Sequence, residues 1–342
     1  MHKENFFLNS DTYENNYKPV FDEKKYNFKS VIQYLIVLPY ELALSENCII
    51  SLPEKNEVYC FNFKRLEKEK SYSAGGEGEP GKIPFNETCV EMSLFTEKIY
   101  YLTEKIGSEI FDRLLEYLNY IITSYLIKTK QEDIYIISKE MLEPFSLSRH
   151  VNIPDFNTIS NNLLFLHPNI VYQKEMLDIE KQSEIVRYST VVKDNSNPFL
   201  LSEELMINAR RDFKRGFYKE TILNAQTSVE TLLRILFQEI LKIEGLSDEE
   251  IETKQQNLGF ITMVKKEFSS RIGGSWDIKN TRKEVGNWHE NCYLLRNRIA
   301  HGGYQPNFVE TDRGIYSADK LRVFLVKRIR KTSKFKGIAE YL

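Results

Sequence analysis

Apolar residues repeat with two different periods, which divides the chain into a part with strand-like runs and a part with helical stripes. Three short runs rich in β-branched and aromatic residues predict strands in a meander or small sheet: Cys48–Ser51, Glu57–Phe63 and Cys89–Phe95. The apolar spacing from Ser108 to about Lys128 predicts a helix, and a further strand is expected at Ile134–Ile137. The charged, Gly-rich stretch Lys68–Pro84 predicts a loop, and Glu143–Asn169, broken by prolines, gives no clear pattern.

After about residue 197 the apolar residues follow helical spacing throughout. A polar stretch that ends at Pro198 predicts the domain boundary, so we expect domains at 1–197 and 198–342. The first predicted helix is capped by Ser202, stops at Gly216 and has a buried stripe that starts at Leu201. Tyr218–Lys242, ended by Gly245, and a short helix with a capping box at Ser247 follow. The last two are about Asn280–Ala300, with an inward stripe of Trp288, Cys292, Leu295 and Ile299, and about Ser317–Lys331. The predicted fold class is an α+β N-terminal domain followed by an all-α helical bundle.

The cysteines and the longest apolar runs indicate the compartment. None of the four cysteines belongs to a C-x-x-C pair, which excludes a disulfide scaffold and the usual zinc ribbons. The first residues carry an acid and precede no long apolar run, so no secretory signal is expected. Val31–Leu38 and Leu114–Ile127 are too short or too polar to cross a membrane. We therefore expect a cytoplasmic protein without membrane contact.

Charge is distributed unevenly between the two parts. Residues 1–197 hold 22 Lys and Arg against 30 Asp and Glu, whereas residues 198–342 hold 25 against 19. Lys320–Lys336 contains eight basic residues and no acid. Such a density suggests contacts with the phosphates of RNA, although basic residues near a helix C-terminus also stabilise the helix itself. The expected phosphate-contacting residues of this stretch are Lys327, Arg328, Arg330 and Lys331.

Two other motifs are set aside. Gly76–Gly81 satisfies G-x-G-x-x-G but lacks the strand before it and the helix after it, and its acids would repel a pyrophosphate. His289 and Cys292 lie three residues apart on one predicted helix, but zinc needs three or four ligands and no other Cys or His has a suitable spacing. No metal or other cofactor is expected, and Cys292 is assigned to the core.

The segment Leu294–Gly303, read as LLRNRIAHGG, carries the most specific pattern. It resembles the HEPN domain (higher eukaryotes and prokaryotes nucleotide-binding), whose ribonuclease members carry Arg, a polar residue that is often Asn, three further residues and His. Arg296, Asn297 and His301 occupy these places, and the flanking residues resemble the R-N-x-x-A-H-G variant of ApeA-like HEPN proteins. The resemblance covers roughly residues 198–335 and implies that the helical bundle is a HEPN domain. Arg282 and His289 satisfy the looser Arg-to-His spacing too, with Lys283 in the polar position.

These residue types suit RNA cleavage without a metal. The reaction needs a base for the 2′-OH proton, an acid for the leaving 5′-oxygen and a cation for the charge on the phosphate. His301 suits the base or the acid. The helix C-terminus favours its protonated form, which suits an acid, whereas nearby basic residues would oppose that form. The planar guanidinium of Arg296 suits the phosphate, and Arg298 is either a further phosphate contact or a surface charge. The resemblance implies a 2′,3′-cyclic phosphate and a 5′-OH as products.

Helix geometry restricts how these groups meet. Arg296 and His301 are five residues apart, about 140° around an ideal helix, so their side chains diverge. Either the helix loosens at its glycine end or the cleft is shared between two copies related by a two-fold axis. HEPN ribonucleases usually act as dimers, which favours the second arrangement. Asn297, four residues before His301, is adjacent to it on the helix surface and is expected to orient the imidazole.

We therefore expect a HEPN endoribonuclease that is dimeric through its C-terminal part and cuts tRNA or mRNA. By family analogy such proteins are toxins or antiviral, abortive-infection effectors. The acidic N-terminal domain would then be a sensor or restraint for a phage or host trigger. The alternative is a non-catalytic HEPN module that binds nucleotide or RNA or only dimerises. An N-terminal enzyme lacks support, because residues 1–197 show no carboxylate pair, nucleophile elbow or P-loop.

Overall fold

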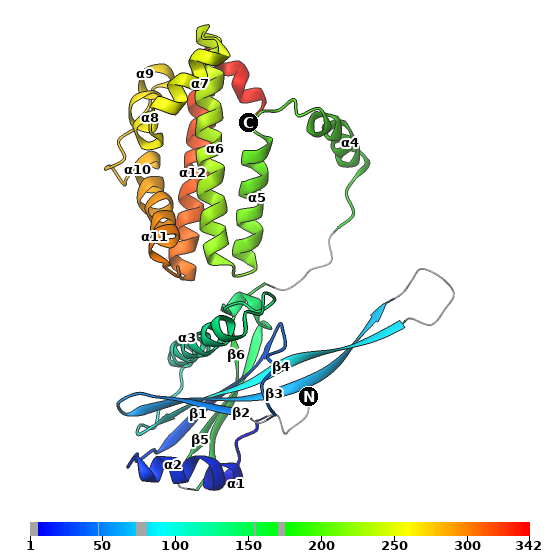
Figure 1. Ribbon diagram of the computed structural model, residues 1–342, viewed down its shortest axis with the longest axis vertical. Coiled ribbons are helices and arrows are strands. Elements are labelled where there is room, and N and C mark those ends of the chain that lie inside the picture. The colour runs from blue at the N-terminus through cyan, green and yellow to red at the C-terminus, as the bar shows by residue number, and fades with distance from the viewer. Residues whose placement is uncertain (1–5, 47, 73–80, 154, 170–174) are drawn as a thin grey trace. The chain divides into compact units, whose positions relative to one another are not determined.

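The chain folds into two compact units (Figure 1). The computed structural model describes residues 6–46, 48–72, 81–153, 155–169 and 175–342. The units comprise Met1–Val171 and Tyr172–Leu342. The predicted boundary after residue 197 falls inside the second unit, behind its first helix, α4 (Ile179–Lys193).

The first unit is built on one antiparallel sheet. Its strands are β1 (Ser30–Leu38), β2 (Cys48–Pro53), β3 (Glu57–Tyr72), β4 (Gly81–Thr96), β5 (Phe145–Asn152) and β6 (Thr158–Phe165). They lie in the order β2-β3-β4-β1-β5-β6, and every neighbouring pair is antiparallel. The central strand β1 is buried on both faces along most of its length, which explains its continuous apolar run. Its sequence therefore lacks the alternation that marks a half-exposed strand.

Helices pack against both faces of this sheet. The long helix α3 (Glu104–Thr129) begins at Thr103, whose side chain accepts the Ile106 N–H, and buries a stripe that includes Leu114 and Leu118. The opposite face carries α1 (Ser10–Thr12), the π-helical turn η1 (Tyr13–Tyr17) and α2 (Lys18–Glu23). Their aromatic side chains cluster on Val31 and Phe95 of the sheet. Both faces thus exclude water from the middle of the sheet.

Several predictions for this unit were wrong. The predicted loop Lys68–Pro84 is partly strand, because β3 extends to Tyr72 and β4 begins at Gly81; residues 73–80 lie outside the described residues. The G-x-G-x-x-G motif lies mostly outside the described residues. Ile134–Ile137 is not a strand; its backbone is held instead by Asn119 of α3, which bonds both the N–H and the carbonyl of Ile137 at 2.8 Å.

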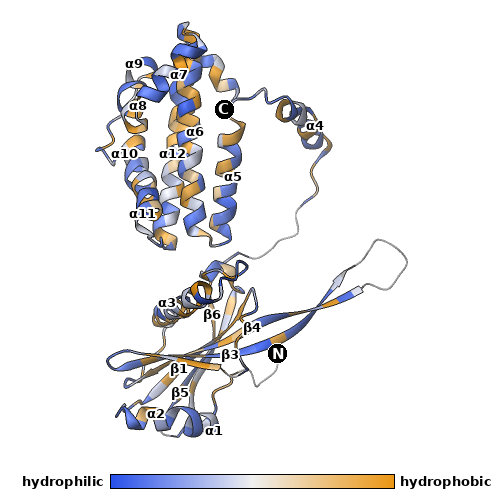
Figure 2. Ribbon diagram, viewed as in Figure 1, coloured by the Kyte–Doolittle hydropathy of each residue, from blue (hydrophilic) through white to orange (hydrophobic). Residues whose placement is uncertain are grey.

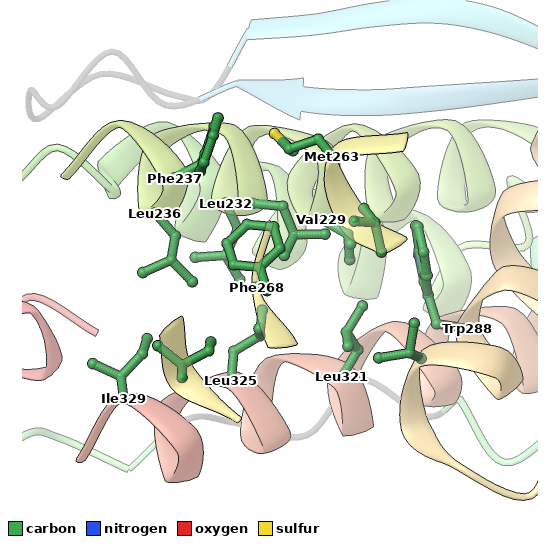
Figure 3. Close-up of a cluster of buried hydrophobic side chains, with 14 of the residues drawn as sticks. Val229, Leu232, Leu236, Phe237, Met263, Phe268, Trp288, Leu321, Leu325 and Ile329 are labelled. Carbon is green, nitrogen blue, oxygen red and sulfur yellow. The ribbon is translucent and has the colours of Figure 1, made fainter. Parts of the chain in front are cut away.

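The second unit is helical. After α4 come α5 (Leu200–Lys214), α6 (Tyr218–Glu244), α7 (Asp248–Asn257), α8 (Phe260–Lys266), α9 (Ser269–Ile272), α10 (Glu284–Trp288), the π-helical turn η3 (His289–Tyr293), α11 (Leu294–Gly302), α12 (Phe308–Lys331) and the 3₁₀ turn η4 (Lys336–Glu340). A second 3₁₀ turn, η2 (Lys139–Met141), belongs to the first unit. Figure 2 shows hydrophobic and hydrophilic residues alternating along α5, α6 and α12. The buried stripes of these helices meet in one core, and Figure 3 shows side chains that α6 and α12 contribute to it.

Two details of the helical prediction need correction. Ser202 does not cap α5 but lies buried inside it, where its hydroxyl donates to the Ser228 carbonyl at 3.1 Å. The buried stripe of α5 consequently runs through Ser202 and Met206, while Leu201 is 54% exposed. The last helix begins at Phe308, well before the predicted Ser317, because Asn307 and Glu310 form a capping box there.

The predicted fold class, an α+β domain followed by an all-α HEPN bundle, was wrong in the size of the sheet and in where the helical part begins. A single six-stranded antiparallel sheet spans residues 30–165, where the sequence predicts a smaller sheet. Helices follow from Ile179, so the helical part begins before the predicted boundary, and α4 was not predicted. The expectation missed β1 because its run is continuously apolar, β5 because it buries polar residues, and β6 because it is mostly exposed.

Candidate ribonuclease site

The LLRNRIAHGG segment lies at the end of one continuous helix formed by α10, η3 and α11. The predicted inward residues of this helix, Trp288, Cys292, Leu295 and Ile299, are all buried. The helix ends at Gly302, and Gly303 follows in the left-handed region with φ of 63°. Its N–H and that of Tyr304 bind the last carbonyls of the helix. The helix begins at Glu284, four residues later than predicted.

Arg296 is half-buried and held by a carboxylate of the neighbouring helix α6. Its Nη2 donates to Oε2 of Glu230 at 3.3 Å. The other oxygen of Glu230 accepts from Nε and Nη2 of Arg234 at 3.2 and 3.0 Å. The Arg296 guanidinium also lies 5.5 Å from the ring centroid of Tyr293. These contacts fix the direction of the guanidinium and leave further N–H groups for a second anion.

His301 and Asn297 lie one helical turn apart, as predicted. The His301 side chain is exposed in the last turn of α11, and Asn297 is half-buried. The helix α11 remains regular as far as Gly302, so it does not loosen before His301. Arg296 therefore points towards α6 while His301 lies about 140° around the helix. One copy of the chain brings together Asn297 and His301 but leaves Arg296 on another side.

Arg298 connects the end of α11 to the start of α12. Its guanidinium lies 3.6 Å from the ring centroid of Tyr304, and its Nη1 is 3.6 Å from Oε1 of Glu310. The Tyr304 hydroxyl donates to the same carboxylate at 2.8 Å. Glu310 in turn accepts the Asn307 N–H in the capping box of α12. These contacts give Arg298 a structural role, although its side chain remains mostly exposed.

The basic residues of α12 divide into internal and exposed groups. Arg322 is largely buried and donates to the hydroxyls of Ser202 and Ser228, and burial lowers its pKa to about 10. Arg328 donates its Nε to the carbonyl of Ile272 at 2.8 Å. Lys327, Arg330 and Lys331 are exposed. They lie 19 to 23 residues beyond the start of α12, about 28–35 Å along it, at the end of the bundle opposite α11 (Figure 1).

His289 and Cys292 lie in different environments. His289 stacks on the ring of Tyr293 with a centroid distance of 5.2 Å, and burial lowers the pKa of its imidazole. Cys292 is fully buried, which raises the pKa of its thiol to about 12. Across the described ranges no three His, Cys, Asp or Glu side chains gather as metal ligands. Cys292 is therefore a core residue, as predicted.

Sequence reasoning missed a polar pocket in the first unit. This pocket, of about 740 Å³, lies between the turn at Glu54–Glu57, the end of β4 and α3. Glu57 accepts hydrogen bonds from Arg113 at 2.8 Å, Tyr100 at 3.1 Å and Tyr59 at 3.2 Å. Tyr100 and Arg113 are distant in sequence from Glu57, and no short motif links them to it. Glu230 and Arg296 are also far apart in sequence, so no local pattern could predict their contact. The sequence shows only that Glu230 and Arg234 have the i, i+4 spacing of an ion pair on one helix.

Comparison of the chain with protein-family models, curated proteins and solved structures gave no match. Among the described helices, none combines the length and apolar character that a membrane span requires.

Proposed function

We propose that the chain is a metal-independent endoribonuclease of HEPN type whose reacting groups are Arg296, Asn297 and His301. The observation that carries the proposal is the position of the R-N-x-x-x-H motif at a helix end. There, a carboxylate-anchored guanidinium and a solvent-exposed imidazole share one helix. Arginine, asparagine and histidine in this order supply a phosphate-binding cation, an orienting amide and a proton-transfer group.

Each group has a distinct role in the proposed reaction. The 2′-oxygen of the RNA attacks the adjacent phosphorus, and the bond to the 5′-oxygen breaks. His301 carries out one of the two proton transfers, to the leaving 5′-oxygen or from the 2′-OH, and solvent water carries out the other, while Asn297 orients the imidazole ring. Arg296 stabilises the charge on the phosphate with the N–H groups that Glu230 does not occupy. The products are a 2′,3′-cyclic phosphate and a 5′-OH.

The proposed cleft lies between two copies of the helical unit. Arg296 and His301 diverge within one regular helix, so a two-fold axis is needed for Arg296 of one copy to face His301 of the other. The exposed position of His301 leaves it accessible to such a second copy. The nuclease is therefore proposed to act as a homodimer through its helical unit.

RNA is proposed to contact Arg298 near the motif and the exposed Lys327, Arg330 and Lys331 at the far end of α12. At about 3.4 Å of rise per nucleotide, the 28–35 Å along α12 correspond to about eight to ten nucleotides. A folded RNA such as tRNA is long enough to reach both ends. Arg328 is a weaker candidate than the sequence suggests, because its Nε already binds a backbone carbonyl.

The proposed biological role is that of a cytoplasmic toxin or antiviral, abortive-infection effector that cuts tRNA or mRNA. The sheet-containing first unit would sense a phage or host trigger and restrain the nuclease. The acidic balance of residues 1–197 against the basic balance of residues 198–342 supports such a division of labour.

The test is cleavage of total tRNA and of a mixed-sequence RNA in EDTA. Wild type is compared with Arg296→Ala, His301→Ala and, as a matched control, Arg282→Ala. Arg282 is exposed on the approach to the same helix and satisfies only the looser spacing. Cleavage by wild type and Arg282→Ala alone is expected. Equal cleavage by all four proteins would contradict the assignment.

A second candidate function is a non-catalytic module that binds nucleotide or RNA or only dimerises. The anchoring of Arg296 by Glu230, away from His301, favours it. Such a module would bind RNA equally well after His301→Ala and would cleave none, even after residues 1–171 are removed.

A further inference from the structure

One face of the sheet in the first unit carries a buried polar cluster in its middle. Gln33 of β1 lies between Ser93 of β4 and Arg149 of β5, and Glu91 is the next residue of β4 on the same face. Gln33, Ser93 and Glu91 are at most 1% exposed. Gln33 donates to the Ser93 hydroxyl at 3.2 Å and accepts from Nη2 of Arg149 at 2.6 Å. Buried charges are costly unless they are hydrogen-bonded, so Glu91 and Arg149 need further partners.

Those partners are main-chain groups of the segment Phe6–Leu8. The carboxylate of Glu91 accepts the N–H of Phe7 and, at 3.1 and 3.2 Å, the N–H of Leu8. Nη2 of Arg149 donates to the Leu8 carbonyl at 2.5 Å. An anion that faces two successive N–H groups and a cation that faces the following carbonyl recognise main chain, whatever the side chains are.

The side chains of the same segment are also recognised. The Arg149 guanidinium lies 4.6 Å from the ring centroid of Phe6, and Nζ of Lys64 lies 4.0 Å from that of Phe7. Leu8 is fully buried in the aromatic cluster on this face of the sheet. Across the described chain, no backbone-to-backbone hydrogen bond holds residues 6–8. The segment is therefore held by side chains, as a peptide ligand is, and not as a strand of the sheet.

One buried acceptor beside the segment has no partner. Asn62 of β3 pairs with Glu91 of β4 and so lies on the same face. It is 3% exposed, and its Oδ1 accepts no hydrogen bond from the residues that the structure describes. Because a buried acceptor without a donor costs free energy, residues 6–8 match this surface incompletely.

We propose that Glu91, Arg149 and Lys64 form a binding site for an extended peptide of another protein, and that residues 6–8 occupy it as an internal ligand. The contacts specify two adjacent aromatic residues followed by an aliphatic one. A peptide that also brings a donor for Asn62 gains a hydrogen bond that the internal segment lacks. A second copy of this chain offers only the same segment, so exchange between copies gains no contact.

Binding of a labelled peptide to the full-length chain tests the site. The probe is the acetylated peptide NFFLNS, residues 5–10, and fluorescence anisotropy measures its affinity. Phe7→Pro removes one of the two N–H groups that Glu91 accepts and so weakens the internal ligand. Because a tethered ligand competes at an effective concentration of about millimolar, the probe should bind Phe7→Pro at least about tenfold more tightly than wild type.

Two further changes should each weaken this binding about tenfold or more. In the Phe7→Pro chain, Glu91→Gln removes the charge that accepts both N–H groups. The matched control, Glu87→Gln, lies on the same face of β4 four residues away and should leave the affinity unchanged. A probe that is N-methylated at its second phenylalanine lacks the corresponding N–H, so it tests the same contact even if Glu91→Gln does not fold.

The proposal is overturned if the probe binds neither wild type nor Phe7→Pro, or binds both equally. It is also overturned if N-methylation leaves the affinity unchanged. A fall in the mass of the chain on Phe7→Pro, measured by light scattering, would show that copies exchange the segment, which also contradicts the proposal. The readout is peptide binding by the first unit, so the result does not depend on RNA cleavage by the second.

Discussion

A mixture of two inactive variants tests the shared cleft. Arg296 and His301 lie about 140° apart around α11 and about 7.5 Å apart along it. If Arg296 of one copy faces His301 of the other, each homodimer contains two identical clefts. Arg296→Ala or His301→Ala then damages both clefts of its own homodimer. A mixed dimer combines both defects in one cleft and leaves the other cleft intact.

The expected activity of the mixture follows from counting clefts. Random pairing of equal amounts gives about half mixed dimers with one working cleft of two, so activity is about a quarter of wild type. The parent variants should each fall at least about 100-fold, as expected for loss of a phosphate-stabilising donor or of a proton-transfer group. Recovery should therefore exceed the parents by about 25-fold. Initial rates on a labelled RNA, after co-expression of the two chains, measure it.

The control pairs Arg296→Ala with the double variant Arg296→Ala, His301→Ala. No cleft in that mixture contains Arg296, so activity should stay at the level of the parents. An equally low activity of the first mixture would refute the shared cleft. The reacting groups would then belong to a single copy, which requires a change in the α11 helix.

Three further predictions concern stability and RNA binding. Burial raises the pKa of Glu91, so its proton is held to higher pH in the folded chain than in the unfolded one. Stability should thus fall as pH rises from about 4.5 through the raised pKa, and Glu91→Gln should flatten this slope in thermal melts. Leu232→Ala, at a 1% exposed core position, should cost about 2–5 kcal/mol in urea unfolding, against less than about 0.5 for the 54% exposed Leu201→Ala. Arg322→Ala should cost about 1–3 kcal/mol in the same assay, because it removes a largely buried ion pair with Glu203 and two hydrogen bonds to the hydroxyls of Ser202 and Ser228. Lys327→Ala should keep stability and lower the salt slope of RNA binding by about one.

The fold could be predicted where one face of an element is buried. The stripe from Trp288 to Ile299, the capping box at Ser247 and the end of α6 at Gly245 are all confirmed. The strands β5 and β6 could not be predicted, because β5 buries polar residues such as Ser146 and His150 and β6 is mostly exposed. Neither strand has the alternation that a sequence pattern detects.

The site was only partly predictable for a related reason. The spacing of Arg296, Asn297 and His301 sets their angles on one helix, and the structure retains that helix. The partner of Arg296 is Glu230, 66 residues earlier in the chain. Long-range packing, not local spacing, decides which carboxylate meets a guanidinium. For the same reason the sequence could not show that Arg322, in the same basic stretch as Lys327, is largely buried whereas Lys327 is exposed.

The chemistry of the RNA ends tests the proposed cleavage reaction. One synthetic RNA that wild type cuts is incubated in EDTA, beside the same RNA with a 2′-deoxy nucleotide at the cut. We predict a 2′,3′-cyclic phosphate and a 5′-OH from the first RNA, no cut in the second, and neither product with His301→Ala. Cleavage of the deoxy substrate, or cleavage by wild type that EDTA abolishes, would contradict a reaction driven by Arg296 and His301.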